Sequence, residues 1–429
     1  MPKIALIGAG SVVFARNMIR DVLSFPELAD STFALMDIDP ERLDLIARLG
    51  RKMIEQVGTG ATLTATLERR EALEGADFVI CMVQVGGLEA FKQDIEIPLR
   101  YGVDQSVGDT LGPGGVFRGM RTIPVLTAMA QEMETLCSRA LLINYSNPMA
   151  INCWAANAAS STRTVGLCHS VQGTASLLSD YVQAPFEEVS YWVAGINHMA
   201  WFLRFEHNGE DLYPRLREVM NNPDAFATNK VRFEIMRCFD YFVTESTHHM
   251  SEYVPYFRTT QQRVEDFATP RWDYYQLCKR DLEPTLKQIR EQLDSDEPVE
   301  MRRSREYGSR IIHAETTGQV QRINGNVPNT GLITNLPAGC CVEVPCYVDQ
   351  LGLHPCYVGD LPPQLAALNR SNIAVQELAV KAGLEGDRRA VVQAVCLDPL
   401  TGALLLPGQI ETMVDEMLAA EAQWLPQFA

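Results

Sequence analysis

Residues 3–11 read KIALIGAGS, an apolar run that stops at two closely spaced glycines. The apolar part predicts a buried strand, and residues 12–23 repeat apolar side chains at the spacing of an amphipathic helix. A second strand is expected over residues 32–36, and the Asp39-Pro40 pair that follows is typical of a helix start. Strand, helix and strand in this order form the βαβ unit of a parallel sheet.

The glycine turn after the first strand suits the binding of a pyrophosphate. Gly8 and Gly10 let the backbone approach such a group closely, and Ser11 opens a helix whose positive N-terminus attracts it. Asp37 ends the second strand, where a carboxylate accepts hydrogen bonds from ribose hydroxyls and repels a 2′-phosphate. These residues predict a nicotinamide cofactor, NAD rather than NADP, although Val13 stands where a third glycine is common. The alternative is a turn that serves only chain reversal.

The alternation of strands and helices continues to about residue 170. Further strands are expected over residues 78–83, 140–144 and 164–167, with an amphipathic helix over residues 122–136. Short strands separated by helices predict a Rossmann-type, doubly wound parallel sheet of the lactate/malate dehydrogenase kind.

Beyond residue 170 the pattern predicts an α+β second domain. It contains expected strands at 188–194, 200–205 and around 331–348, long helices at 281–293 and 364–383, and a charged, solvated loop or helix at 294–305. We therefore expect an NAD-binding domain over residues 1–170 and a catalytic, substrate-binding and oligomerisation domain over residues 171–429. No clean linker separates the two.

The composition disfavours several classes of partner. The formal net charge is −17, and such an acidic excess repels nucleic acid and anionic membranes. No apolar run approaches the roughly 18–20 residues that span a bilayer, and the N-terminus lacks the pattern of a signal peptide. Eleven cysteines without a repeating frame indicate reduced thiols. We expect a cytoplasmic protein without nucleic-acid or membrane partners.

Two segments rich in glycine or asparagine follow strands at the sheet edge where ligands bind in such folds. Residues 108–115, GDTLGPGG, predict a rigid loop of close backbone approach that carries Asp109, or else a plain surface turn. Residues 144–148, NYSNP, place Asn147 where it can contact a ligand, unless it caps the following helix.

A cysteine and a histidine follow the next two expected strands. Cys168 ends one of them and His198 follows the other. A thiolate and an imidazole at adjacent strand ends could share one divalent metal ion in an open site; the alternative is that both pack in the core. Residues 244–253, TESTHHMSEY, add imidazoles, carboxylates and a phenol, a density suited to acid–base catalysis or, alternatively, to a solvated helix or loop.

Together these motifs resemble glycoside hydrolase family 4, the NAD- and manganese-dependent glycosidases. The resemblance covers nearly the whole chain and rests on residues 8–11, 37–39, 109–115, 144–148, 168–170, 195–198, 304–307, 331–337 and 340–344. Within the family the chain is most similar to the α-galactosidases that act on melibiose-type sugars. Members are commonly dimers or tetramers, so the resemblance implies a homodimer or homotetramer.

The resemblance implies an unusual hydrolysis that does not use two carboxylates. NAD⁺ takes a hydride from C3 of the sugar, and the resulting ketone makes the C2 proton acidic. A base removes that proton while Mn²⁺ acts as a Lewis acid, and the C1–O bond breaks by elimination. Water then adds, and the hydride returns to C3 without net redox change.

The resemblance also implies residue roles. Cys168 and His198 match metal ligands. Asn147 and Asn197 match positions that contact substrate hydroxyls, and Asp109 is expected beside them.

The proton-transfer roles are less uniform within the family. His169 stands where phosphosugar members have an Asp as the proposed acid, so its role as general acid is a hypothesis. The C2 base is His249 or Tyr253, with Glu245 orienting either one.

The substrate class stays open at this point. An α-glucosidase, α-glucuronidase or α-galacturonidase is the alternative within the family, and Arg305 could pair with a uronic acid carboxylate. An NAD-dependent 2-hydroxyacid dehydrogenase and a non-catalytic NAD-responsive binding protein are the alternatives outside it.

Overall fold

Parallel strands build the N-terminal half of the central sheet, in the order β3-β2-β1-β4-β5-β6. The structure is a computed structural model that describes residues 1–428. The strands are β1 (Lys3–Ile7), β2 (Thr32–Met36), β3 (Thr62–Thr66), β4 (Phe78–Cys81), β5 (Leu141–Asn144) and β6 (Thr164–Gly166). The predicted Rossmann-type sheet is thereby confirmed.

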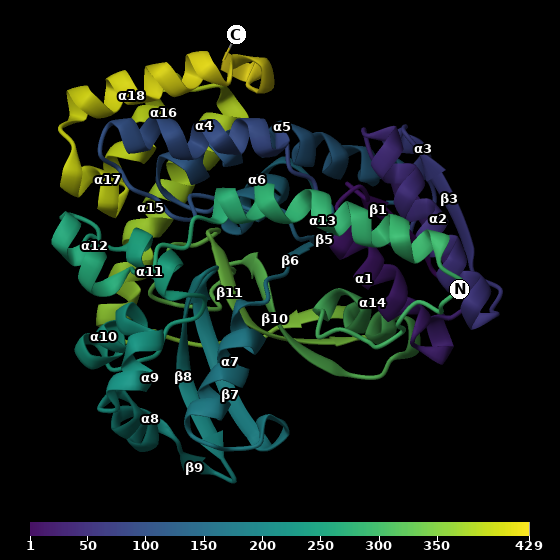
Figure 1. The fold of residues 1–429 in the computed structure, drawn as a ribbon, viewed down its shortest axis with the longest axis horizontal. Helices are drawn as coiled ribbons and strands as arrows, with labels where there is room; N and C mark the ends of the chain where they lie inside the picture. Colours follow the sequence, from purple (N-terminus) through teal and green to yellow (C-terminus); the bar gives the residue numbers. More distant parts are fainter. Residues whose placement is uncertain (429) are drawn as a thin grey trace.

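Alternate residues of β1 face two different hydrophobic cores, as expected for a doubly wound sheet. Ile4 and Leu6 belong to a cluster that includes residues of α1 (Val12–Leu23) and α2 (Pro40–Val57). Ala5 and Ile7 belong to a second cluster, which includes Leu126 and other apolar residues of α5 (Gly112–Leu136). Helices therefore cover both faces of this part of the sheet (Figure 1).

The second half of the chain extends the same sheet. Its strands are β7 (Val189–Ile196), β8 (Met199–His207), β9 (Glu210–Asp211), β10 (Gln321–Pro328), β11 (Cys341–Asp349) and β12 (Gly352–Pro355). They complete a 12-stranded sheet in which β10 pairs with β6 at one residue pair, Asn326 and Gly166. Because the two halves share a sheet, no linker separates them in the sequence.

Helices surround the sheet and form the outer layers (Figure 1). Those of the first half are α1 (Val12–Leu23), α2 (Pro40–Val57), α3 (Arg69–Leu73), α4 (Gly87–Arg100), α5 (Gly112–Leu136), α6 (Met149–Ala159) and α7 (Ser170–Tyr181). The second half adds α8 (Tyr213–Met220), α9 (Pro223–Thr228), α10 (Lys230–Phe239), α11 (Thr247–Tyr253), α12 (Gln261–Phe267), α13 (Tyr274–Asp294) and α14 (Tyr307–Thr317). The C-terminal helices α15 (Pro363–Glu385), α16 (Arg388–Leu397), α17 (Pro399–Leu404) and α18 (Pro407–Ala420) pack near α4 and α5.

Three sequence-based expectations need correction. The edge strand β3 was not expected, because its sequence TLTAT is polar and its residues are exposed or half-buried. The second half of the glycine-rich segment is helix rather than loop, since α5 begins at Gly112. The region around residues 331–348 becomes strand only at Cys341, and the preceding strand β10 ends at Pro328.

The glycines at the start of α5 allow the preceding loop to pack closely against the helix. A Cβ on Gly114 would lie 2.5 Å from the carbonyl oxygen of Gly108, and one on Gly115 would lie 2.3 Å from the carbonyl carbon of Thr110. The loop that carries Asp109 therefore lies directly against the first turn of α5, which fixes its position.

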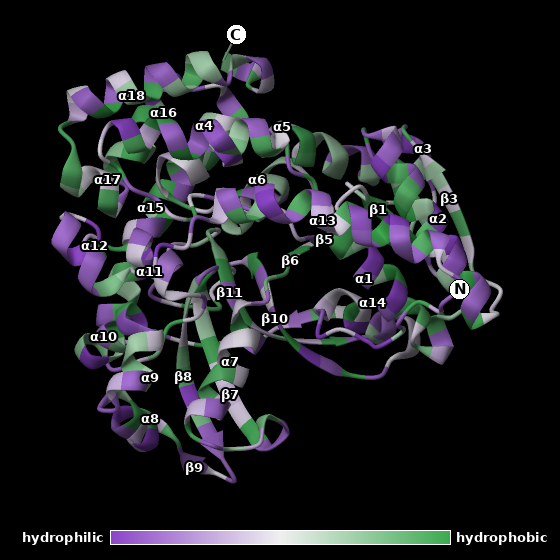
Figure 2. Cartoon of the chain, in the orientation of Figure 1, coloured by the Kyte–Doolittle hydropathy of each residue, from purple (hydrophilic) through white to green (hydrophobic). Residues whose placement is uncertain are grey.

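The charged stretch at residues 294–305 is irregular and packs on the first half. The backbone amide and hydroxyl of Ser304 donate to Asp21, and Arg303 donates to the backbone oxygen of Ser24 at 2.8 Å. The outer helices carry both green apolar and purple hydrophilic residues, as expected for amphipathic helices that pack on a sheet (Figure 2). Over residues 1–428, no helix has the length and apolar character needed to cross a membrane.

Candidate active site

The turn after β1 is shaped by close contacts that leave no room for side chains. Gly8 has φ +86°, and a Cβ there would lie 2.9 Å from the backbone carbon of Met82. A Cβ on Gly10 would lie 2.8 Å from the carboxyl carbon of Asp37, whose Oδ2 accepts a hydrogen bond of 2.7 Å from the Gly10 amide. Ser11 comes directly before α1 and makes no capping hydrogen bond with its side chain. Bare backbone therefore surrounds the start of α1, as a bound pyrophosphate requires.

The predicted cofactor acid lies at the end of β2. Oδ1 of Asp37 accepts a hydrogen bond of 2.9 Å from the Asp39 amide, and the next residue, Ile38, is 87% exposed. Each carboxylate oxygen keeps a free lone pair for a ribose hydroxyl. Asp39 is committed elsewhere, because its side chain caps α2 by accepting from Glu41 and Arg42. These residues fit an NAD molecule.

Cys168 and His198 meet although their strands are not neighbours. Cys168 follows β6 and His198 lies in the turn between β7 and β8, while β10 and β11 separate β6 from β7. The Sγ of Cys168 is 3.2 Å from Nε2 of His198. His198 has φ +61°, a left-handed conformation that is rare for non-glycine residues and costs on the order of 1–3 kcal/mol. The backbone of His198 is thus strained, and in this conformation its imidazole lies beside the thiol.

The other ring nitrogen of His198 has polar partners of its own. Nδ1 lies 3.2 Å from Oγ1 of Thr110 and 3.2 Å from Oη of Tyr253. A ligating histidine usually donates its second N–H to such an oxygen, which leaves Nε2 for a metal ion. Although burial lowers the pKa of His198, the Cys168 sulfur and the Glu245 carboxylate raise it to about 10. The cluster therefore attracts positive charge, which a metal cation can supply.

Buried His249 lies on the other side of this cluster. Its Nδ1 is 2.8 Å from Oγ of Ser246 and 3.4 Å from Oε1 of Glu245, and its Nε2 is 3.9 Å from Oδ1 of Asp109. Burial lowers the pKa of His249 and His198 adds to this effect, so the imidazole is neutral near pH 7. A neutral imidazole between two carboxylates can accept a proton.

Asp109 and the predicted asparagines lie at the same end of the sheet. Nδ2 of Asn147 donates to Oδ2 of Asp109 at 3.0 Å. Although burial raises it, the charges of His249 and Arg118 hold the pKa of Asp109 below its usual value. Asn197 is 1% exposed, and neither polar atom of its side chain has a hydrogen-bond partner within residues 1–428. Buried amides are almost always paired, so this one is available to a ligand.

His169 points to a different partner. Its Nε2 pairs with Oε1 of Glu306, and the imidazole packs against the rings of Phe14 and Tyr145 at centroid distances of 5.8 and 6.2 Å. The side chain of His169 is 49% exposed, whereas that of Glu306 is 8% exposed. Burial lowers the pKa of His169, but the hydrogen bond and charge of Glu306 raise it overall. A protonated, accessible imidazole at this position can donate a proton.

Two predicted site residues have surroundings that differ from expectation. The phenol of Tyr253 is buried and within hydrogen-bond distance of Nδ1 of His198, so it helps to orient that ring. The guanidinium of Arg305 lies over the Phe186 ring at 5.3 Å and donates to Oγ of Ser176 at 3.3 Å. Arg305 is therefore engaged by Phe186 and by Ser176 of α7.

Sequence reasoning missed several members of the site. Glu306 pairs with His169 across 137 residues, and Thr110 reaches His198 across 88 residues. Glu245 was assigned only an orienting role, yet one of its oxygens lies within 4.8 Å of ligand atoms of both Cys168 and His198. The sequence indicates these residues only through the density of polar side chains in 108–115, 244–253 and 304–307. That density does not show which side chains contact each other.

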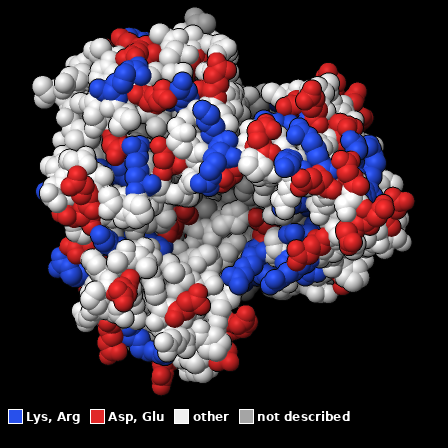
Figure 3. All heavy atoms as spheres, viewed as in Figure 1, with Lys and Arg blue, Asp and Glu red and all other residues white. Residues whose placement is uncertain are grey.

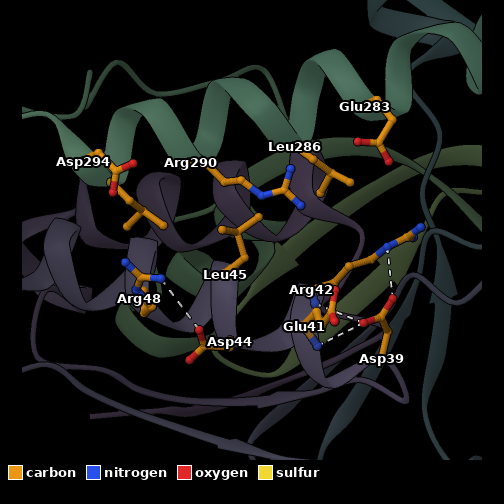
Figure 4. A pocket seen from close by; sticks show the side chains of 11 residues that line it. Asp39, Glu41, Arg42, Asp44, Leu45, Arg48, Glu283, Leu286, Arg290 and Asp294 are labelled. Atoms are coloured by element: carbon orange, nitrogen blue, oxygen red, sulfur yellow. Dashed lines mark hydrogen bonds and ion pairs between the residues drawn. The ribbon is translucent and has the colours of Figure 1, made fainter.

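A groove elsewhere on the surface is unsuited to this chemistry. It has a volume of about 560 Å³ and runs between α2 and α13, where Arg48 pairs with Asp44 and Arg42 with Asp39 (Figure 4). No histidine or cysteine lines it. The face drawn in Figure 3 is instead hollowed near the middle, over the region where Figure 1 places β6, β10 and β11.

The fold and the cluster together define a class: an enzyme with a Rossmann-type sheet and a thiol–imidazole–carboxylate centre beside it. Residues 3–184 match the model described as Family 4 glycosyl hydrolase, and residues 193–401 match the Family 4 glycosyl hydrolase C-terminal domain. The chain therefore belongs to glycoside hydrolase family 4. The resemblance inferred from the sequence is confirmed, and the dehydrogenase alternative is set aside.

Individual relatives agree with this assignment. An α-galactosidase of Bacillus subtilis (strain 168) is 40% identical over 432 residues, which cover 100% of both chains. An α-galactosidase of Rhizobium meliloti (strain 1021) is 39% identical over 100% of this chain and 90% of that protein. The crystal structure of LplD from Bacillus subtilis has a TM-score of 0.90 at 26% identity and covers 97% of this chain and 100% of LplD.

Proposed function

We propose that this glycosidase cleaves α-galactosides of the melibiose type with the help of bound NAD⁺ and Mn²⁺. The observation that carries the proposal is the 3.2 Å approach of Cys168 Sγ to His198 Nε2 beside a dinucleotide-binding sheet. A conventional glycosidase uses two carboxylates and requires neither a thiol–imidazole pair nor a dinucleotide-binding sheet. The two α-galactosidases that are about 40% identical over the full chain support the choice of sugar.

The cofactors and the residues divide the chemistry between them. When bound, NAD⁺ supplies a reversible hydride acceptor for the sugar and the metal ion supplies a Lewis acid. Gly8, Gly10 and Ser11 would hold the pyrophosphate, and Asp37 would hold the ribose. Cys168 and His198 are the metal ligands, with Thr110 and Tyr253 fixing the ring of His198.

His249 is the base that removes the C2 proton in this proposal. Its neutral imidazole lies between the carboxylates of Glu245 and Asp109, which stabilise the imidazolium formed on proton uptake. The alternative base, Tyr253, is less suitable because its phenol faces His198 and burial raises its pKa far above neutrality.

His169 is the acid that protonates the glycosidic oxygen. Its raised pKa keeps it protonated, and its partial exposure lets it reach a leaving group. Asn147, Asn197 and Asp109 bind sugar hydroxyls. The side-chain amide of Asn197 supports this role because it has no hydrogen-bond partner within residues 1–428. The orientation of Arg305 toward Phe186 and Ser176 favours a neutral sugar over a uronic acid.

Two further expectations belong to the same proposal. We expect a cytoplasmic enzyme, which agrees with the free state of its cysteines in residues 1–428. We also expect a homodimer or homotetramer, to be checked by light scattering coupled to size-exclusion chromatography.

A panel of nitrophenyl α- and β-glycosides tests the substrate class. With NAD⁺, Mn²⁺ and a thiol reductant, the α-galactoside should be cleaved fastest, and the His198→Asn variant serves as the control for contaminating glycosidases. Preference for an α-glucoside or α-galacturonide would overturn the choice of sugar. Turnover that survives removal of NAD⁺ and metal would overturn the proposed chemistry, and steady accumulation of NADH would indicate a dehydrogenase.

A further inference from the structure

The carboxylate of Glu245 completes a set of three potential ligand atoms. Oε2 of Glu245 is 3.9 Å from Nε2 of His198, and one ligand atom from each of Cys168, His198 and Glu245 lies within 4.8 Å of the others. Ligands bound to one ion at roughly 2.0–2.3 Å lie roughly 3–4 Å apart. A small adjustment of side chains would therefore bring all three onto a single cation.

The backbone holds Glu245 in a strained conformation. Its φ is +70°, in the left-handed region that a non-glycine residue seldom adopts. Thr244 before it is tied to β8, since its amide donates to the Ala200 carbonyl at 2.9 Å. Ser246 after it caps α11 by accepting from the amide of His249. Of residues 244–246, only Glu245 has a positive φ, and the turn at this residue directs its carboxylate to the thiol and the imidazole.

A buried arginine maintains this turn. Nη1 of Arg232 donates to the backbone carbonyl of Glu245 and, at 3.2 Å, to Oγ1 of Thr174. Nε of Arg232 donates to Oδ1 of Asn229 at 2.9 Å. Arg232 is 4% exposed, and no carboxylate neutralises it by direct contact within residues 1–428. Strained backbone that is stabilised from the core is typical of functional sites.

The ligand preferences of divalent metals suggest a role for the Glu245 carboxylate. Thiolate and imidazole alone suit zinc and other borderline or soft ions, whereas manganese prefers oxygen ligands. One carboxylate added to one thiolate also balances the charge of a divalent cation. We propose that Glu245 is a third protein ligand of the metal, so that the site is Cys168–His198–Glu245 and accepts an oxygen-preferring ion. This proposal depends on the metal site of the proposed function.

A second role for Glu245 makes a different prediction. Oε1 is 3.4 Å from Nδ1 of His249, so the carboxylate could act only by orienting that base. Ser246 is the closer partner of the same nitrogen, at 2.8 Å. If orientation were its sole function, the loss of the carboxylate would reduce turnover but leave metal affinity unchanged.

Metal affinity distinguishes the two roles without measuring activity. We suggest titrating the chelator-treated, full-length protein with Mn²⁺ and measuring free Mn²⁺ by electron paramagnetic resonance. Glu245→Gln should raise the Kd for Mn²⁺ at least about tenfold, while the Kd for the softer ion Cd²⁺ changes less than about threefold. His249→Gln and the distant carboxylate variant Glu315→Gln should both leave the Kd for Mn²⁺ within about threefold. NAD⁺ binding checks that each variant is folded, and Glu245→Asp replaces Glu245→Gln if the latter does not fold.

The outcomes separate this inference from the proposed function. A Kd for Mn²⁺ that Glu245→Gln leaves unchanged, while Cys168→Ser abolishes binding, would overturn the third ligand and keep the metal site. A Kd unchanged by Cys168→Ser and His198→Asn would overturn the metal site itself. An equal loss with His249→Gln would mean that Glu245 acts through the base.

Discussion

At the scale of single residues, the pairing of His169 with Glu306 is the basis for the proposed protonation of the leaving group. Glu306 is buried, and its backbone amide donates a hydrogen bond of 3.1 Å to Oγ of Ser304, which helps to fix the position of the residue. Phe14 and Tyr145 hold the other side of the imidazole. These contacts orient the imidazole for the proposed proton transfer.

Glu306→Gln should therefore affect substrates according to their leaving group. Loss of a positioned acid costs about 10²–10⁴-fold where the leaving group needs protonation, as in melibiose. Nitrophenyl α-galactoside has a good leaving group and should lose less than about threefold in kcat. Steady-state kinetics on both substrates measures this, with Glu315→Gln as the matched variant. Equal losses on both substrates would contradict the role of His169 as acid.

Some site residues can be predicted from sequence, and others cannot. Cys168, His198, Asp109 and Asn147 follow strands or open helices, where strand ends converge by topology. Glu306 escapes prediction because an irregular segment carries it, and that segment is positioned by the Ser304–Asp21 contacts formed only in the folded chain.

At the scale of elements, two capping aspartates respond to pH in opposite ways. Asp398 caps α17 by accepting from the amide and hydroxyl of Thr401 at 2.8 and 2.6 Å, and burial raises its pKa to about 6. Asp387 caps α16, and hydrogen bonds from Ala390 and Lys381 hold its pKa below the usual value.

The sign of each effect follows from linkage. Between about pH 4 and 6, Asp398 is protonated in the folded protein but ionised in the unfolded chain, where its pKa is near 3.8. Wild-type stability relative to Asp398→Asn should thus increase as the pH falls from 7.5 to 4, by about 2–3 kcal/mol. Relative to Asp387→Asn it should decrease chiefly below about pH 4, where the unfolded chain binds a proton at this residue before the folded protein does. Urea unfolding at several pH values checks this, and parallel trends would contradict it.

A buried ion cluster fastens the C-terminal segment to α4 and α5. Arg121 donates to both oxygens of Asp94, at 2.8 and 2.7 Å, and also pairs with Glu421; the three side chains are 0–1% exposed. Removing the cation leaves two buried carboxylates without a partner.

Arg121→Met should lower the free energy of unfolding by about 3–5 kcal/mol. Arg100→Met is the matched control, because it removes an exposed pair with Glu416 and should cost at most about 1 kcal/mol. Chemical unfolding of both variants measures the difference. Losses of similar size would show that the buried cluster has no special effect.

The elements that sequence predicts best are those with a strong apolar pattern. Residues 3–7, 12–23 and 32–36 form strand, helix and strand at the expected positions. Strand β3 escapes prediction because it is a polar edge strand that pairs only with β2. The start of α5 escapes because glycines disfavour helix, and only the tight contact with residues 108–110 explains their presence.

At the scale of the whole molecule, one sheet carries both the glycine turn of the cofactor site and the candidate metal ligands. The glycine turn follows β1 and Cys168 follows β6, in the parallel part, while His198 follows β7, in the antiparallel part. The joint at Asn326 and Gly166 is a single residue pair, which no local pattern could reveal. Under the proposed function, this geometry would bring a hydride acceptor and a Lewis acid to one sugar, which would explain why a glycosidase has a dehydrogenase-like fold.

The central claim is that C2 of the sugar loses and regains a proton during hydrolysis. The most direct test is cleavage of an α-galactoside in D₂O with NAD⁺ and Mn²⁺, followed by proton NMR of the released galactose. We predict deuterium at C2 of the product, with no net formation of NADH. Galactose released with its original hydrogen at C2 would contradict the account.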